Sequence, residues 1–76
     1  MKNWNKISPV QITRTKNGTD MSVFQNSKNM FTATILDFRL VTLLDKEELQ
    51  ADKICKTKKQ AVEFCENLAL EIESAE

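Results

Sequence analysis

The last third of the chain places apolar and polar side chains with the period of an α-helix. At about 100° per residue, the apolar residues after Thr57 fall on one broad side, whereas Glu63 and Glu66 fall opposite. The apolar side consists of Ala61, Val62, Phe64, Cys65, Leu68, Ala69 and Ile72. Thr57 is the expected N-cap, because its hydroxyl can accept a hydrogen bond from the amide of Gln60, whose side chain can reach back to the Thr57 amide. The sequence therefore predicts an amphipathic helix that begins at Lys58 and lies on another layer.

Residues 10–25 alternate between apolar and polar positions with the period of two that β-strands have. Asn17-Gly18 interrupts this alternation, and the dipeptide favours a two-residue type I′ turn because both of its positions need a positive φ. A hairpin with this turn brings apolar residues together on one face of the sheet. The pairs that it predicts are Lys16 with Thr19, Arg14 with Met21, and Ile12 with Val23.

A second turn is predicted at Ser27-Lys28-Asn29, with Asn29 in the left-handed conformation. The pairs that this three-residue loop predicts are Gln25 with Phe31, Val23 with Ala33, and Met21 with Ile35. The resulting core face is Val10, Ile12, Met21, Val23, Phe31, Ala33 and Ile35. Phe24 falls on the opposite face, among polar residues of the neighbouring strands.

The segment from Ile35 to Leu44 fits two structures. Continued alternation would bury Asp37, which is costly for an unpaired carboxylate, so we expect a bulge, a turn or a strand end near this residue. Phe38–Leu44 then forms a fourth strand, and a helix is the alternative because the leucines here also have helical spacing. Ile54-Cys55 is a candidate for a last short strand. The predicted fold class is α+β: an antiparallel sheet of three to four strands followed by one C-terminal amphipathic helix packed on one face (ββββα).

The chain has 76 residues, a size at which one hydrophobic core is marginal and self-association commonly adds burial. We therefore expect one small domain over residues 1–76, with residues 1–8 flexible and a homodimer as the oligomeric state. No apolar run approaches the length that spans a bilayer. We expect a cytoplasmic protein with no membrane partner.

The chain offers little for catalysis or for metal binding. It has no His and no Tyr, and no Gly-rich phosphate loop occurs, so we expect a non-enzymatic protein without a cofactor. Cys55 and Cys65 are the only cysteines, and two thiolates without His leave a zinc site short of ligands. Cys65 lies on the apolar side of the predicted helix and is expected to be buried, whereas Cys55 precedes the helix and is expected to be more exposed.

The two halves of the chain carry opposite charge. Residues 1–39 contain six Lys and Arg against two Asp, a net charge of +4, and residues 40–76 contain five Lys against nine Asp and Glu, a net charge of −4. If the helix covers one face of the sheet, the exposed face and its hairpin loops are expected to be basic. A basic sheet with an exposed aromatic residue, Phe24, fits nucleic acid, because Lys and Arg meet phosphates and aromatic rings stack on bases. A solvated surface of mixed charge is the alternative.

Lys56, Lys58 and Lys59 surround the predicted helix start, where cations oppose the helix dipole. One explanation is an anion such as phosphate, held by the free amides and the lysines. The other is that acidic residues of segment 45–52 neutralise them.

Two short stretches resemble DNA-binding families. Residues 54–61, Ile-Cys-Lys-Thr-Lys-Lys-Gln-Ala, look like the strand-to-helix junction of the arm-DNA-binding domains of tyrosine integrases. Leu36-Asp37-Phe38-Arg39, followed by the capped helix, is similar to the Asp-hydrophobic-Arg strand motif of the positive-cofactor family of single-stranded-DNA-binding transcription coactivators. That resemblance implies a ββββα fold and dimers that bind melted DNA on the sheet. The chain differs in having Cys55-Lys56 where that family has small residues.

These observations predict a small accessory protein that binds single- or double-stranded DNA through a basic sheet face and the lysines at the helix start. The expected nucleic-acid contacts are Lys16, Phe24, Lys28, Arg39, Lys56, Lys58 and Lys59. The alternative is a protein-interaction or inhibitor module. It would bind itself or a partner protein through a sheet edge, or through the acidic helix face around Leu70.

Overall fold

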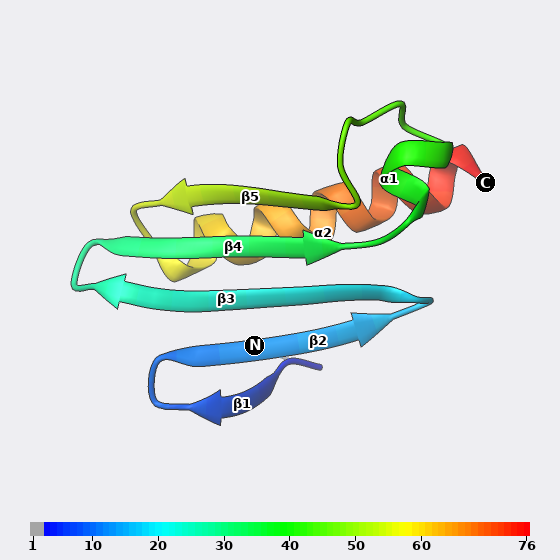
Figure 1. Ribbon diagram of the computed structural model, residues 1–76. Coiled ribbons are helices and arrows are strands. Elements are labelled where there is room, and N and C mark those ends of the chain that lie inside the picture. Colours follow the sequence, from blue (N-terminus) through cyan, green and yellow to red (C-terminus); the bar gives the residue numbers. More distant parts are fainter. Residues whose placement is uncertain (1–2) are drawn as a thin grey trace.

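A computed structural model describes residues 3–76, which form one antiparallel sheet with a long helix across one of its faces (Figure 1). The strands follow each other across the sheet in the order β1-β2-β3-β4-β5. The elements are β1 (Asn5–Ser8), β2 (Gln11–Lys16), β3 (Thr19–Ser27), β4 (Met30–Leu36), α1 (Arg39–Thr42), β5 (Gln50–Cys55) and α2 (Lys58–Ala75). The predicted α+β class with a C-terminal helix on the sheet is confirmed, but the sheet has five strands, not three or four.

The hairpin between β2 and β3 has the predicted register. Asn17 and Gly18 both have positive φ, 51° and 83°, as a type I′ turn requires. Because a one-residue slip would move every apolar side chain of a strand to the other face, this turn determines which residues of β2 and β3 meet the helix. The three predicted pairs are present: Lys16 with Thr19, Arg14 with Met21, and Ile12 with Val23.

The turn between β3 and β4 has the predicted register but not the predicted loop. Ser27 pairs with Met30, so the turn is shorter than expected, and Asn29 does not adopt the predicted left-handed conformation. The register is preserved because a bulge between Gln25 and Ser27 takes up the extra residue. Asn26 at this bulge accepts a hydrogen bond of 2.6 Å from the Thr32 hydroxyl. The predicted pairs Gln25 with Phe31, Val23 with Ala33 and Met21 with Ile35 are all present.

The predicted strand Phe38–Leu44 is wrong, and the helical alternative is the observed one. β4 ends at Leu36, the short helix α1 follows, and its Leu40 is fully buried. β5 takes the position beside β4 and extends the predicted Ile54-Cys55 strand back to Gln50.

Strand β1 lies within the segment expected to be flexible. Asn5–Ser8 pairs antiparallel with β2, with an irregularity in the register between Lys6 and Ser8. Met1 and Lys2, the other part of that prediction, lie outside the described residues.

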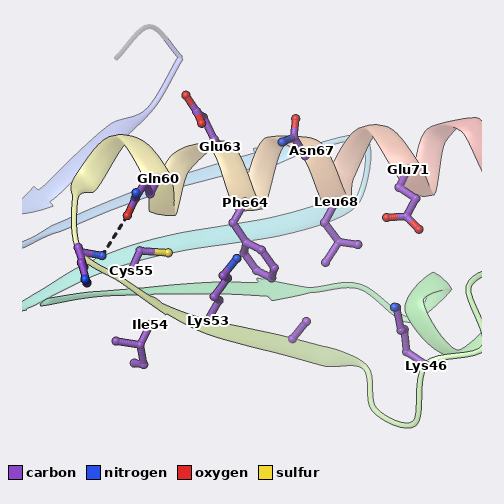
Figure 2. Close-up of a pocket in the computed structure, with 12 residues that line it drawn as sticks. Lys46, Lys53, Ile54, Cys55, Gln60, Glu63, Phe64, Asn67, Leu68 and Glu71 are labelled. Atoms are coloured by element: carbon purple, nitrogen blue, oxygen red, sulfur yellow. Dashed lines mark hydrogen bonds between the residues drawn. The ribbon is translucent and has the colours of Figure 1, made fainter.

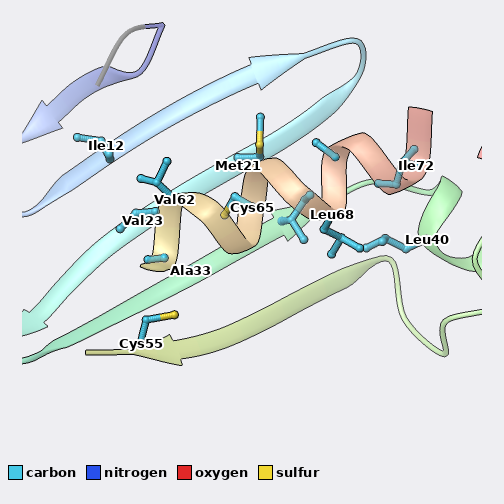
Figure 3. Packing of buried hydrophobic residues seen from close by; sticks show 13 residues of the cluster. Ile12, Met21, Val23, Ala33, Leu40, Cys55, Val62, Cys65, Leu68 and Ile72 are labelled. Atoms are coloured by element: carbon cyan, nitrogen blue, oxygen red, sulfur yellow. The ribbon is translucent and has the colours of Figure 1, made fainter. Parts of the chain in front are cut away.

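The core lies between α2 and the sheet (Figure 3). Its buried residues are Ile12, Met21, Val23, Ala33, Ile35, Leu40, Cys55, Ala61, Val62, Cys65, Leu68, Ala69 and Ile72. The predicted apolar side of the helix is confirmed, with Phe64 only partly buried and Leu70 exposed.

The burial predictions for Val10 and Cys55 fail. Val10 is 41% exposed, because it lies between β1 and β2, beyond the strands that α2 covers. Cys55 is buried, because it faces the helix side of β5. No helix within residues 3–76 is long and apolar enough to cross a membrane.

Candidate nucleic-acid interface

Exposed lysines from separate parts of the chain gather at one end of the sheet. The β1–β2 turn, the β3–β4 turn and the junction between β5 and α2 all lie at this end (Figure 1). The last row of paired residues here joins Val10, Gln25, Phe31 and Cys55 across the sheet. Lysines at or near this end are Lys6, Lys28, Lys56, Lys58 and Lys59, and we call them the basic end.

The register places these lysines close to one another. Lys28 lies in the turn before Met30, and Lys56 directly follows Cys55, the partner of Phe31 on β4. Lys6 of β1 and Lys58 of α2 line the same small hollow, of about 140 Å³. Lys6 is not among the contacts predicted from the sequence, because no strand was expected before Pro9.

The start of α2 is capped largely as predicted. The Thr57 hydroxyl accepts a hydrogen bond of 3.1 Å from the Gln60 amide. The Gln60 side chain reaches back, but it accepts from the Lys56 amide at 3.2 Å and not from that of Thr57. The cap satisfies some of the free amides in the first turn, while the side chains of Lys58 and Lys59 extend into solvent.

The lysines of the basic end are largely unpaired. Among residues 3–76, only Lys59 of this group forms an ion pair, a 4.0 Å contact with Glu63 in which the Lys59 side chain is 83% exposed. Of the acidic segment 45–52, residues 45–49 lie beside α1 at the opposite end of the molecule (Figure 1), and Asp52 on β5 forms no ion pair with these lysines. Neutralisation by that segment, one of the two explanations for the lysine cluster, is therefore not observed.

Carboxylates pair with both arginines and with Lys16, whereas Lys46, at the opposite end, has no ion pair among the described residues. The Arg14 guanidinium donates to Glu66 at 3.0 Å, and the Lys16 ammonium lies 3.5 Å from Glu73. A hydrogen bond from the Asn17 side chain, together with Lys16, lowers the pKa of Glu73. Lys16, a predicted nucleic-acid contact, is therefore engaged within the protein and lies far from the basic end.

Arg39, another predicted contact, belongs to a buried network. Its guanidinium Nη2 lies 2.7 Å from Asp37 Oδ2 and also donates to the Asn17 carbonyl oxygen, and Nη1 pairs with Glu76. The Thr19 hydroxyl donates to the same Asp37 oxygen at 2.6 Å. This network fixes the β2–β3 turn against the start of α1.

The same network explains a wrong prediction about Asp37. The strand does end at Leu36 as expected, yet Asp37 is buried and only 3% exposed. Its carboxylate is not isolated, because hydrogen bonds from Arg39, and secondarily from Thr19, lower its pKa to about 2 against the opposing effect of burial. The interaction also raises the pKa of Arg39. A buried carboxylate is tolerated here because its partners come from two other segments.

The face of the sheet opposite α2 is not basic. Side chains alternate along each strand, and the register places Lys6, Arg14, Lys16 and Lys53 on the helix side. The open face carries Asp20 and Asp52 among threonines and other uncharged residues.

Phe24 lies on this open face as predicted and is 40% exposed. Its partner Thr32 pairs in turn with Ile54, one row from the basic end. Of the predicted contacts, the fold thus places Lys28 and the lysines at the helix start at one end, far from Lys16 and Arg39, with Phe24 one row away on the face opposite α2.

The thiols are poorly placed for chemistry. Cys55 and Cys65 are both free and buried. Burial raises the pKa of Cys65 to about 11, so its thiolate is scarce at neutral pH. Within residues 3–76 there is no group of three or more His, Cys, Asp or Glu side chains that could hold a metal ion.

The resemblance to the positive-cofactor family implies a strand at Leu36-Asp37-Phe38-Arg39, whereas this stretch leaves β4 and enters α1. Comparisons of the chain with protein-family models, with curated proteins and with solved structures found no match.

Proposed function

We propose that this protein is a small non-enzymatic accessory protein that binds nucleic acid through its basic end. The observation that carries the proposal is the selective pairing of cations. Ion pairs within the protein engage Arg14, Lys16 and Arg39. No carboxylate within the described residues pairs with Lys6, Lys28, Lys56 or Lys58. An unpaired lysine can release counterions from a phosphate backbone at little cost, because no internal ion pair has to break.

The arrangement of these lysines suits a chain of phosphates more than one small anion. They come from β1, the β3–β4 turn and the β5–α2 junction, so they are spread over the end of a molecule whose shorter dimensions are 23 and 15 Å. The first amides of α2 add partial positive charge at the same place. Phe24, beside the β3–β4 hairpin, supplies an exposed ring for stacking an unpaired base.

The proposal is tested by fluorescence anisotropy with labelled single-stranded and double-stranded oligonucleotides of arbitrary sequence. Four to five phosphate contacts predict that log K falls with log salt with a slope of about −3 to −4.5. The double substitution Lys58→Glu and Lys59→Glu should weaken binding about 100-fold at low salt. It should not unfold the protein, because acids at a helix N-terminus are favourable.

Lys46→Glu is the matched control, because Lys46 is exposed and unpaired among the described residues but lies at the opposite end. With both variants compared at physiological salt, where the Debye length is ~8 Å, Lys46→Glu should leave the affinity within about twofold. Equal losses in both variants would indicate a general charge effect, and no binding at low salt would remove nucleic acid as the ligand. A Phe24→Ala variant that weakens only single-strand binding would assign the stacking role.

A further inference from the structure

A groove of about 870 Å³ runs between β5 and α2 and shares Lys56, but no other lysine, with the basic end (Figure 2). Phe64 and Leu68 point from the helix towards the strand and form an apolar floor with Ala51 and Cys55. Lys53 rises from β5 into the groove, with its ammonium 5.6 Å from the centre of the Phe64 ring. The groove is therefore apolar at its base and has a cation at its centre.

One wall of this groove is the edge of the sheet. β5 pairs with β4 alone, and the two strands stay in unbroken register from Gln50 to Cys55. The other edge strand, β1, is only four residues long, has an irregular register and is followed by Pro9, all features that discourage further pairing. β5 has none of these features, and its outer backbone groups have no strand partner within residues 3–76. An extended segment can therefore add to the sheet at β5.

We infer that the groove binds an extended segment of a partner protein, which pairs with β5 as a sixth strand and packs against α2. Side chains of neighbouring strands that face the same side lie next to each other. On the helix side, β5 presents Ala51, Lys53 and Cys55. The partner segment consequently has an acidic residue beside Lys53, with apolar residues two positions before and two positions after it.

Charge supports this choice of partner. The strand side of the groove is lined by Lys46, Lys53 and Lys56, none of which forms an ion pair among the described residues. The carboxylates of the groove, Glu63 and Glu71, lie on the helix rim, and Glu63 is paired with Lys59. An acid held next to β5 thus meets positive charge, and the Phe64 ring keeps the Lys53 ammonium over the floor.

A second copy of this chain is a poorer occupant. A two-fold axis perpendicular to the sheet would pair two β5 strands antiparallel, and symmetry then sets one residue opposite its own copy. In the two such registers that pair the most residues of β5, either Asp52 faces the Asp52 of the second copy or Lys53 faces its Lys53, so like charges repel. The self-pairing that would produce a homodimer through this edge is disfavoured by the residues at the centre of the strand.

The test uses a fluorescein-labelled peptide, Thr-Val-Thr-Glu-Thr-Val-Thr, titrated with the whole protein. A second peptide carries Lys in place of the central Glu. Two further peptides keep the sequence of the Glu peptide but carry N-methyl groups on alternate residues, so that one blocks the amides of one strand edge and the other blocks those of the opposite edge. We expect saturable binding of the Glu peptide, at least tenfold weaker binding of the Lys peptide, and loss of binding with one of the two N-methylated peptides. Hydrogen exchange of the 50–55 amides should slow when the Glu peptide binds.

The charge-reversal variant Lys53→Glu should invert the preference and bind the Lys peptide better, which a merely unfolded variant cannot do. Lys28→Glu, an exposed lysine outside the groove, and the double variant at Lys58 and Lys59 should leave peptide affinity within about twofold. Equal binding of the Glu and Lys peptides, or retention of binding by both N-methylated peptides, would overturn the inference. So would light scattering that shows a dimer whose 50–55 amides are already protected without peptide.

Discussion

Replacing Asp37 with Asn tests whether the buried network at the β2–β3 turn stabilises the fold. The Asp37 pKa is about 2 in the folded protein against an ordinary value of 3.8. At 1.36 kcal/mol per pKa unit, this difference contributes about 2 kcal/mol to the free energy of unfolding at neutral pH. The loss of the charge also leaves Arg39, whose side chain is only 12% exposed, with Glu76 as its remaining carboxylate partner.

The contribution of Asp37 to the free energy of unfolding depends on pH. Because folding lowers the Asp37 pKa, the stabilisation is fully present above the ordinary pKa near 4 and is lost as the pH falls towards 2. Asp37→Asn should therefore lower the free energy of unfolding by about 2 kcal/mol at pH 7, and the melting temperature by ~8–16 °C. The difference between wild type and variant should shrink to about 0.5 kcal/mol at pH 2.

Urea denaturation followed by circular dichroism, at several pH values from 7 down to 2, measures this difference directly. Asp52→Asn is the control, because Asp52 is an exposed carboxylate on the open face whose side chain accepts hydrogen bonds from Gln50 alone among residues 3–76. Its effect should stay within about 0.5 kcal/mol at every pH. The reasoning fails if Asp37→Asn matches wild type at pH 7, or if its destabilisation persists undiminished at pH 2.

Two further predictions concern the long helix. Thr57→Ala removes the hydroxyl that accepts from the Gln60 amide, so the free energy of unfolding should fall by about 1 kcal/mol in urea denaturation; an unchanged midpoint would show that water replaces the cap. Because burial raises the pKa of Cys65 to about 11, iodoacetamide at pH 8 should label it only after unfolding, and mass spectrometry that finds this thiol alkylated in the folded protein would contradict the packing of α2.

Local patterns in the sequence were sufficient where one turn or one face decides the structure. Asn17-Gly18 needs two positive φ angles, which selects the turn and with it the register of β2 and β3. The apolar side of α2 follows from helical spacing, and Thr57 marks its start because the cap is made within four residues. These features depend on residues that are close together in the chain, so the sequence alone predicts them.

Features that depend on distant partners were not predictable in the same way. Asp37 was expected to avoid burial, whereas Arg39, two residues further along, and Thr19, from the far side of the hairpin, both donate hydrogen bonds to its carboxylate. The Asp37 amide donates to the Leu49 carbonyl at 2.9 Å, next to the last β4–β5 pair, and α1 begins two residues later at Arg39. The leucine spacing in this region fits both structures, so local pattern alone left the choice open.

The candidate site changed for a related reason. The sequence divides into a basic half and an acidic half, but neighbouring strands are antiparallel, so consecutive turns lie at alternate ends. Lys6, Lys28 and Lys56 are separated by 22 and 28 residues, and the meander returns each of them to the same end. Lys16 and Arg39 lie at the other end, where α2 ends and where Glu73 and Glu76 pair with them, and Arg14 pairs with Glu66 midway along α2. The charge therefore differs between the two halves of the sequence but between the two ends of the folded molecule. Ion pairs neutralise most of this charge, except at the start of α2. An anionic ligand should therefore contact Lys28 and Lys58 together, although they are 30 positions apart in the chain.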